Sequence, residues 1–158
     1  MSFLGLETFE TIVTHTPLVS IDLLVRNIDG LVLLGRRINP PAKNYWFVPG
    51  GRIYKGETLE GAFSRISTEE LGQQLKMSDA DYQGLYEHFY EDSVFGKHIS
   101  THYIVNAFEL TLEEENYLPL VQHQCYQWFS QCELLSETKV HHYSKAYFDS
   151  KLIFKDKI

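Results

Sequence analysis

Two adjacent glutamates near the end of a predicted helix carry the clearest chemical signal in the sequence. Glu69 and Glu70 close the helix expected over residues 58–71, and Gly50-Gly51 lies just upstream of that helix. Carboxylates are hard oxygen ligands that suit Mg²⁺, an ion that keeps several waters and bridges the phosphates of a substrate. Glycine lets the backbone approach a diphosphate closely. The pattern therefore predicts a magnesium site for a substrate that contains a diphosphate.

Arg65 is placed to brace this region. It lies four residues before Glu69 and eight after Glu57, and side chains four residues apart are neighbours on a helix. We therefore interpret Glu57 and Arg65 as structural residues that hold the preceding loop against the helix. Glu69 stays open between a partner of Arg65 and a contributor to the metal site, whereas Glu70 is the candidate metal ligand.

The spacing of this region resembles the Nudix box, the motif of a family of metal-dependent hydrolases. The matching positions are Gly51, Glu57, Arg65, Glu69, Glu70 and Gly72. The box departs from its usual form at Ile66, where a glutamate normally follows the arginine, and at the aliphatic positions held by Ser67 and Gln73. A site with fewer carboxylates holds fewer metal ions, which disfavours a multi-metal attack on phosphorus.

Matches outside the box extend the resemblance to one branch of this family, the GDP-mannose glycosyl hydrolases. They comprise Phe3-Leu4 with Phe9, residues 16–20 leading to Asp22, Leu34-Gly35-Arg36-Arg37, residues 44–52, His88-Phe89-Tyr90, Thr101-His102-Tyr103 and Gln122-His123. The resemblance implies an α/β fold in which a mixed β-sheet is sandwiched between α-helices. It also implies a single Nudix hydrolase domain over residues 1–158 and a homodimer.

The activity that this resemblance implies is hydrolysis of GDP-mannose, and also of GDP-glucose, at the anomeric carbon with inversion. The products are GDP and a free hexose, and the cofactor is Mg²⁺, with Mn²⁺ as an alternative. The implied metal ligands are the Gly50 carbonyl, Glu70 and Gln122, and the implied general base is His123. The resemblance assigns Arg37, Arg52 and Tyr103 to the departing diphosphate, and Phe3, Leu4, Phe9, Asp22, Arg37 and His88 to substrate binding.

This assignment agrees with elementary chemistry. Inverting hydrolysis of a sugar generally needs an acid for the leaving group and a base for the water. A diphosphate held by Mg²⁺ and two arginines leaves readily as an anion, so only the base must be supplied. The imidazole of His123, with an unperturbed pKa of about 6.5, accepts a proton at neutral pH.

Three alternatives stay open at this point. A conventional Nudix diphosphatase would cleave a nucleoside diphosphate derivative at phosphorus, with Glu69 and Glu70 as sufficient ligands. A nucleotide-sugar sensor would bind GDP-mannose without turnover, and Ile66 would then mark a decayed active site. A protein-interaction scaffold would bind no nucleotide. Retention of Glu70, Gln122 and His123 favours an enzyme over a sensor.

The elements expected to position these residues alternate between strands and helices, which predicts a mixed sheet covered by helices. Apolar and β-branched runs predict strands at 18–25, 31–36, 83–90, 102–110 and 126–129, with a further apolar run at 46–48. Helices are expected over 6–13, 58–71 and 144–154, with Thr58 as the cap and Gly72 as the stop of the middle one. Asp22 interrupts an apolar run, so it is either a satisfied polar group of the core or a contact to sugar hydroxyls. His141-His142 is expected at the surface, because adjacent side chains diverge.

Composition narrows the class of partner. The chain has 158 residues, of which 44% are hydrophobic, and this is enough for a core. A net charge of −7 argues against a nucleic acid or an anionic membrane as the partner. No stretch approaches the roughly 18 apolar residues of a membrane span, and Cys125 and Cys132 fit neither a metal site nor a disulfide framework. We therefore expect a cytoplasmic protein, and the small-molecule nucleotide sugar that we expect as its partner is implied by the resemblance described above.

Overall fold

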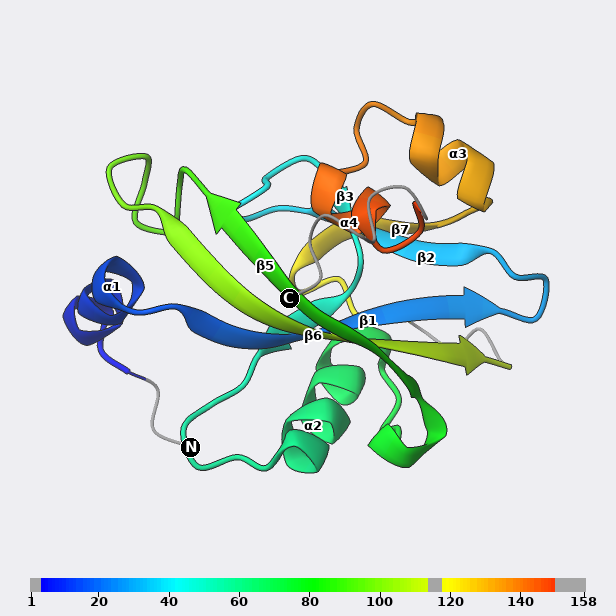
Figure 1. Ribbon diagram of the computed structural model, residues 1–158, viewed down its shortest axis with the longest axis horizontal. Coiled ribbons are helices and arrows are strands. Elements are labelled where there is room, and N and C mark those ends of the chain that lie inside the picture. The colour runs from blue at the N-terminus through cyan, green and yellow to red at the C-terminus, as the bar shows by residue number, and fades with distance from the viewer. Residues whose placement is uncertain (1–3, 114–117, 150–158) are drawn as a thin grey trace.

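A seven-stranded sheet forms the frame of the computed structural model, which describes residues 4–113 and 118–149. Its strands are β1 (Leu18–Asn27), β2 (Val32–Arg37), β3 (Trp46–Phe47), β4 (Gly50–Arg52), β5 (Asp81–Tyr90), β6 (Thr101–Leu112) and β7 (His123–Phe129). The helices are α1 (Leu6–His15), α2 (Leu59–Leu71), α3 (Gln131–Ser136) and α4 (His142–Ala146), with a 3-10 turn η1 (Met77–Asp79). The predicted α/β class, a mixed sheet with flanking helices, is confirmed (Figure 1).

Strand β1 occupies the centre of the sheet. The order is β3-β2-β1-β6-β5, with β4 paired to β1 and β7 paired to β2. β1 and β6 run parallel, whereas the other pairs are antiparallel. Residues 20–25 of β1 are all buried, since a central strand is covered on both faces.

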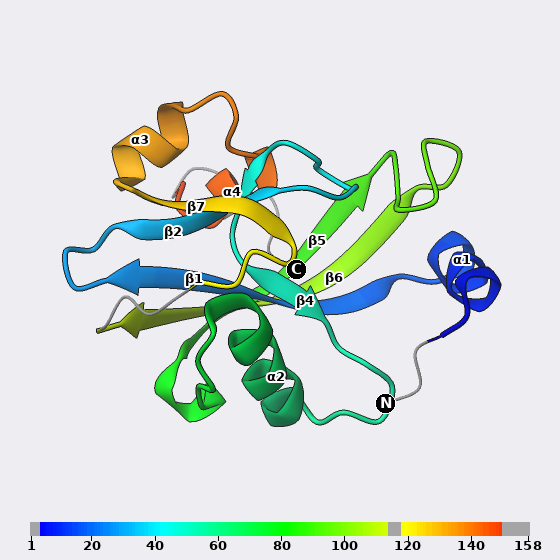
Figure 2. The same cartoon turned by 180° about the vertical axis from the view of Figure 1, so that it is seen from behind.

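Two apolar clusters cover the two faces of β1. On one face, Ile21 packs with Phe63 of α2, and on the other, Leu24 packs in a cluster with Tyr147 near the end of the chain. Figures 1 and 2 show α2 on one side of the sheet and α3 and α4 on the other. Because successive side chains of a strand point to opposite faces, Asp22 shares the face of Leu24 and points away from α2.

Helix α2 begins and ends close to the residues that the sequence predicts. The Thr58 hydroxyl caps it by accepting a hydrogen bond from the backbone N–H of Gly61 at 3.1 Å. Gly72 follows with a φ of 70°, a left-handed conformation that glycine adopts at low cost. This cap and this stop confirm the predicted helix to within one residue at its start.

Other predicted bounds are corrected. Helix α1 runs to His15, two residues further than expected. Strand β7 begins at His123, not at residue 126, because His123 pairs with Arg37 of β2. The last helix spans His142–Ala146, not residues 144–154, and residues 150–154 of that prediction lie outside the described residues. Helix α3 was not predicted, although Ser130 and Glu133 form a capping box that marks its start.

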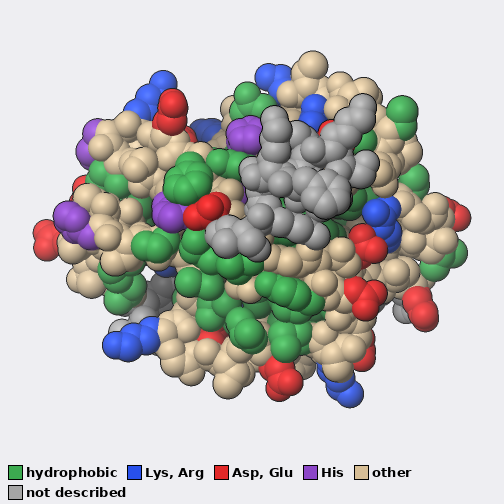
Figure 3. Space-filling view, in the orientation of Figure 1, with side chains coloured by type: hydrophobic (Ala, Val, Ile, Leu, Met, Phe, Trp, Pro, Cys, Tyr) green, Lys and Arg blue, Asp and Glu red, His purple; other side chains and the backbone are tan. Residues whose placement is uncertain are grey.

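The surface of the sheet carries exposed apolar side chains at its β5 edge. Figure 3 shows hydrophobic side chains gathered over β5 and β6, and the side chains of Tyr82 and Phe89 in β5 are exposed. In the described part of the chain, no helix is both long enough and apolar enough to cross a membrane.

Candidate active site

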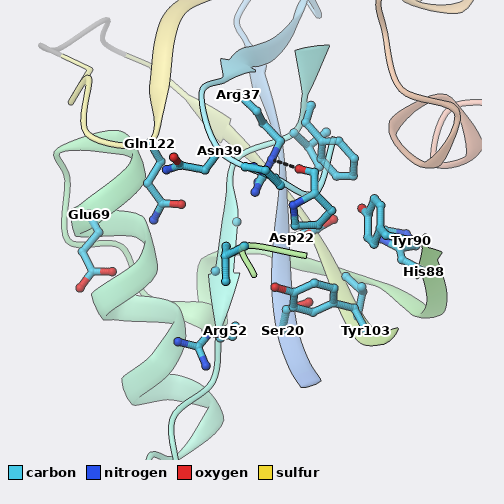
Figure 4. Close-up of a pocket in the computed structure, with 18 of the residues that line it drawn as sticks. Ser20, Asp22, Arg37, Asn39, Arg52, Glu69, His88, Tyr90, Tyr103 and Gln122 are labelled. Atoms are coloured by element: carbon cyan, nitrogen blue, oxygen red, sulfur yellow. Dashed lines mark hydrogen bonds between the residues drawn. The ribbon is translucent and has the colours of Figure 1, made fainter. Parts of the chain in front are cut away.

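A cavity of about 260 Å³ is lined by residues of strands β1 to β6, of helices α1 and α2, and of the segments that follow β2 and precede β7. The predicted site residues that line it are Phe9, Asp22, Arg37, Gly50, Arg52, His88, Tyr103 and Gln122. Figure 4 shows Asp22 between Arg37 and Arg52, with His88, Tyr90 and Tyr103 along one side. Of the other predicted residues, Leu4, Glu70 and His123 do not line the cavity, and Phe3 lies outside the described residues.

Gly50 fits its position because no side chain can be placed there. It pairs with Asp22 in the antiparallel register of β1 and β4. A Cβ atom on Gly50 would lie 2.5 Å from the Asp22 Oδ1 and 2.6 Å from the backbone oxygen of Ile21. The backbone of β4 therefore passes directly against the Asp22 carboxyl, which lets main-chain atoms line the cavity.

Asp22 is a buried carboxyl with an unusual proton affinity. Burial raises its pKa from 3.8 to about 7, against the lowering effects of a hydrogen bond from Tyr147 and of the nearby Arg37 charge. The Tyr147 hydroxyl lies 2.7 Å from Asp22 Oδ2. Asp22 is therefore a hydrogen-bonded polar group of the core that also lines the cavity, and its contact with sugar hydroxyls stays a prediction.

His88 and the rings of two tyrosines, Tyr90 and Tyr103, line one side of the cavity, with further aromatic rings packed behind them. His88 stacks on Tyr143 with ring centroids 4.0 Å apart, and burial lowers the His88 pKa to about 3, so the ring is neutral at neutral pH. The expectation that His141 lies at the surface is wrong. Its half-buried ring packs 5.2 Å from that of Phe47, and burial lowers its pKa to about 4.

The two predicted phosphate-binding arginines are held by weak contacts. Arg37 Nε donates to the Pro41 carbonyl at 2.9 Å, and the Arg52 guanidinium lies 4.1 Å from the ring centroid of Phe9. Within the residues that the structure describes, neither Arg37 nor Arg52 forms an ion pair. Their charges are therefore available to an anionic ligand in the cavity.

Arg65 ties the loop before α2 to the helix, as the sequence predicts. Its guanidinium reaches both Glu57 oxygens, at 2.7 and 2.9 Å, and the Arg52 carbonyl at 2.7 Å. It also pairs with Glu69 at 2.9 Å. The hydrogen bond from Arg65 lowers the Glu57 pKa. The half-exposed Glu69 lines the cavity as well, so its pairing with Arg65 is confirmed, whereas a contribution to a metal site stays a prediction.

Glu70 and His123 form a buried pair beside the cavity. His123 Nε2 lies 3.0 Å from Glu70 Oε2, and both side chains are almost fully buried. The His123 ring covers Gly35, where a Cβ would collide with the imidazole. Its Nδ1 is buried without a hydrogen-bond partner among the described residues. The predicted ligand and the predicted base are therefore adjacent, although neither lines the cavity.

The oxygen atoms near the cavity fit an ion with few protein ligands. The Gly50 backbone, the Gln122 amide and the Glu69 carboxylate belong to residues that line it. No group of three or more His, Cys, Asp or Glu side chains suited to a metal occurs among residues 4–113 and 118–149. Such a set suits Mg²⁺, which takes many of its ligands from water and substrate phosphates, better than an ion enclosed by protein side chains.

The sequence missed several residues around this cavity. Ser20, Asn39 and Tyr90 line it, and Tyr147 supports it from the end of the chain. Ser20 had a signal, because it shares a strand face with Asp22 in the two-residue period of β1. Tyr147 had none, because it meets Asp22 from 125 residues away.

A comparison of the sequence with models of known protein families shows the family of this chain. A family model described as the NUDIX domain matches residues 16–150, which include the box, the cavity and the α4 segment. The chain belongs to the Nudix family. Nudix hydrolases generally use divalent metal ions such as Mg²⁺, in agreement with the oxygen donors described above.

A relative with an assigned role is similar to most of this chain in sequence. The low-salt glycan biosynthesis protein Agl8 of Haloferax volcanii is 44% identical over 117 residues, covering 74% of this chain and 73% of the relative.

Solved structures share the fold at low sequence identity. A MutT protein from Methanosarcina mazei has a TM-score of 0.69 and 22% identity, covering 89% of this chain and 96% of its own. The NUDIX domain of Shewanella oneidensis NrtR, solved with ADP ribose, has a TM-score of 0.63 and 16% identity, with 94% of each chain covered. These likenesses show the Nudix fold.

Proposed function

We propose that this Nudix hydrolase cleaves GDP-mannose, and GDP-glucose, at the anomeric carbon, releasing GDP and a free hexose with inversion in the presence of Mg²⁺. The sequence resemblance to the GDP-mannose branch supports this substrate, and the name of the Agl8 relative supports a link to glycans. The following observations support the site of cleavage and the roles of individual residues.

The observation that carries the proposal is the apolar side chain at the altered position of the box. Ile66 is fully buried, and a Cβ on Gly51 would lie 3.2 Å from its Cγ1. Ile66 therefore fills the space beneath the glycine loop with hydrocarbon and supplies no oxygen to a metal. Attack on phosphorus that relies on several clustered metal ions lacks a carboxylate here, whereas departure of GDP from a sugar carbon requires only that its charge be stabilised.

Positive charge at the cavity suits a diphosphate leaving group. Arg37 and Arg52 line the cavity without ion-pair partners in the described part of the chain. Bound Mg²⁺ would add charge stabilisation at the diphosphate, with Gly50, Glu70 and Gln122 as its proposed ligands. Desolvation raises the Tyr103 pKa, so this phenol stays protonated and is a hydrogen-bond donor for the departing oxygen.

The remaining residues divide between the nucleotide and the sugar. Asp22 and His88 present hydrogen-bonding groups at the cavity wall, which suits hexose hydroxyls. The Phe9 ring, which lies against Arg52, and the exposed Leu4 are proposed to contact the nucleotide. Phe3 is proposed for the same contact from the sequence resemblance alone.

His123 is the proposed general base. With its proton on Nε2 and donated to Glu70, the imidazole keeps an unpaired Nδ1 that accepts a proton. Because the ring does not line the cavity, this role requires the side chain to turn toward the substrate when the ligand binds. The 3.0 Å contact to Glu70 is therefore the arrangement that must change before reaction.

Hydrolysis in ¹⁸O-labelled water tests the site of cleavage. The protein is incubated with GDP-mannose and Mg²⁺, the products are separated, and their masses are measured by mass spectrometry. Label in the free hexose is expected, because water attacks carbon. Label in a nucleotide or a sugar phosphate would instead establish a conventional diphosphatase, an alternative that Glu69 at the cavity favours. Tight binding of GDP-mannose with no product over hours would identify a sensor.

Two further properties are proposed with this function. A homodimer is supported by the exposed apolar residues Leu4 and Leu6 near the start of the chain, Leu6 with 78% of its surface exposed. A cytoplasmic location and a single domain over residues 1–158 are proposed from composition and resemblance, and sedimentation and cell fractionation test them.

A further inference from the structure

Near the end of the described chain, a buried tyrosine contacts two residues of the cavity wall from behind. We propose that Tyr147 is a positioning residue that fixes Asp22 and His88 in the orientations needed to bind a hexose hydroxyl. The inference rests on the proposed function for its substrate. Its structural part, the fixed orientation of two side chains by a third, stands on the geometry alone.

The Tyr147 hydroxyl lies between the two cavity residues. It is 2.7 Å from Asp22 Oδ2 and 3.2 Å from His88 Nε2. Asp22 and His88 line the cavity, whereas Tyr147 does not. All three side chains are buried, so water does not substitute for these contacts at low cost. Tyr147 therefore acts on a ligand only through its two neighbours.

Counting protons sets the direction of this chain of hydrogen bonds. A phenol has one proton to donate, and above its pKa of about 7 the Asp22 carboxyl is ionised and only accepts. Tyr147 therefore donates to Asp22 Oδ2 and accepts from His88 Nε2, which must carry the proton of the neutral imidazole. Burial, which lowers the His88 pKa to about 3, agrees with a single proton on this ring. The arrangement fixes one tautomer of His88, with Nδ1 as the acceptor.

The same contact determines which Asp22 oxygen is left for a ligand. Tyr147 occupies Oδ2, while Oδ1 lies 2.5 Å from the position that a Cβ of Gly50 would take, and Gly50 is another residue of the cavity lining. A carboxylate held at one oxygen presents the other in a fixed direction. Because the oxygen is an acceptor, the ligand group that it suits is a hydroxyl donor, which a hexose supplies and a diphosphate does not.

Other contacts of the α4 segment hold the tyrosine in place. Ser144 Oγ accepts a hydrogen bond from the Val48 N–H at 3.1 Å, and the Tyr143 hydroxyl accepts from the Phe89 N–H and donates to the Phe89 carbonyl. The Tyr147 ring packs edge-on at 4.7 Å from the ring of Tyr86. The segment is thus fixed to strands and loops on several sides, and the hydroxyl pays little entropy to reach Asp22.

The test compares Tyr147→Phe with Tyr82→Phe in the full chain. Both variants remove one phenolic oxygen, but only Tyr147 contacts Asp22 and His88, whereas Tyr82 is exposed and lies outside the cavity lining. Long-range ¹⁵N correlation spectra of the histidine rings, recorded above the Asp22 pKa of about 7, report the tautomer of His88. The wild-type ring and the Tyr82→Phe ring are expected to carry the proton on Nε2, and Tyr147→Phe is expected to change the His88 ¹⁵N shifts toward the other tautomer or a mixture. A wild-type ring protonated at Nδ1, or unchanged shifts in Tyr147→Phe, would overturn the positioning role whatever the activity is.

Kinetics then connect the positioning to the sugar. With GDP-mannose, Tyr147→Phe is expected to lower kcat/KM by about 10-fold to 100-fold, as expected for loss of a hydrogen bond to a charged group. Inhibition of Tyr147→Phe by GDP, which lacks the hexose, is expected to stay as in the wild type. The control Tyr82→Phe is expected to retain the wild-type kcat/KM. Equal losses for GDP-mannose and GDP would contradict a sugar-directed role. A wild-type protein that releases no hexose would refute the proposed function, while the ¹⁵N spectra would still decide the role of Tyr147.

Discussion

His123 is the residue on which the proposed chemistry depends most. Its imidazole is held by Glu70 at 3.0 Å and has a second nitrogen without a partner in the described residues. The Glu70 contact holds the ring outside the cavity lining, so this contact must change before the reaction. A positioned base then typically contributes about 10²-fold to 10⁴-fold to the rate.

Replacement of this imidazole tests the assignment. The variant His123→Gln is expected to lose about 10²-fold to 10⁴-fold in kcat with little change in KM, since the base acts in the reaction and not in binding. Steady-state release of mannose from GDP-mannose measures both constants. The control is His142→Gln, because His142 is exposed and lies outside the cavity lining. Retention of the wild-type kcat by His123→Gln, with an unchanged unfolding midpoint, would assign the base elsewhere.

At the scale of elements, α2 combines the functional motif with the core. Its Ile66 and Phe63 are fully buried against β1, while Glu69 on the same helix lines the cavity. Exchanging residues between the buried face and the cavity face of α2 would therefore reduce the stability of the fold. The side chain of Ile66, at the position where the usual box has a glutamate, is thus part of the core packing.

Restoring the usual glutamate tests this conclusion. The variant Ile66→Glu is expected to destabilise the fold by about 3–5 kcal/mol, because it buries a charge that has no partner. The matched control is Leu59→Glu in the exposed first turn of α2, expected to change stability by no more than about 0.5 kcal/mol. Urea unfolding followed by circular dichroism measures both variants. An Ile66→Glu protein as stable as the wild type would show that this space accommodates a carboxylate after all.

The sequence predicted elements whose cause is local and missed those whose cause is distant. Helix α2 was found through Thr58 and Gly72, which act within a few residues. Strand β4 was missed because three residues with two glycines carry no strand pattern, and pairing with β1 alone defines it. The start of β7 at His123 was missed for the same reason.

The residues of the candidate site show the same difference between local causes, which the sequence reveals, and distant ones, which it does not. The box and the segments before it identified residues such as Asp22 and Arg37 that the fold brings to one cavity. The sequence did not reveal that His123 and Glu70 are paired beside that cavity, because their proximity depends on how β7 packs over α2. The support from Tyr147 depends on the whole chain.

At the scale of the whole molecule, Asp22 links protonation to stability. Its pKa rises from 3.8 to about 7 on folding, so the folded state binds more protons than the unfolded state between these values. The stability contributed by Asp22 is therefore greatest at low pH and falls as the pH rises through this window. His88 acts in the opposite direction, because its pKa of about 3 lies below the ordinary 6.5.

The variant Asp22→Asn isolates this contribution. The free energy of unfolding of the wild type relative to the variant is expected to fall as the pH rises from about 4 to about 7, following the linkage between proton binding and folding. Urea titrations at several pH values in this range provide the measurement. A difference that stays constant with pH, or that grows as the pH rises, would show that the Asp22 carboxyl is not buried in the way described.

The parallel pairing of β1 with β6 also bears on how this chain folds. It joins residues 18–27 to residues 101–112, so the central ladder cannot form until most of the chain has collapsed. Contacts between such distant segments require closure of a long loop and slow the rate-limiting step. During synthesis, β1 cannot pair with β6 until β6 has left the ribosome. Until then the apolar edge of β1 is exposed and can associate with other copies of the chain. Because of this topology, we expect folding of the protein to depend on chaperones when it is expressed at a high level.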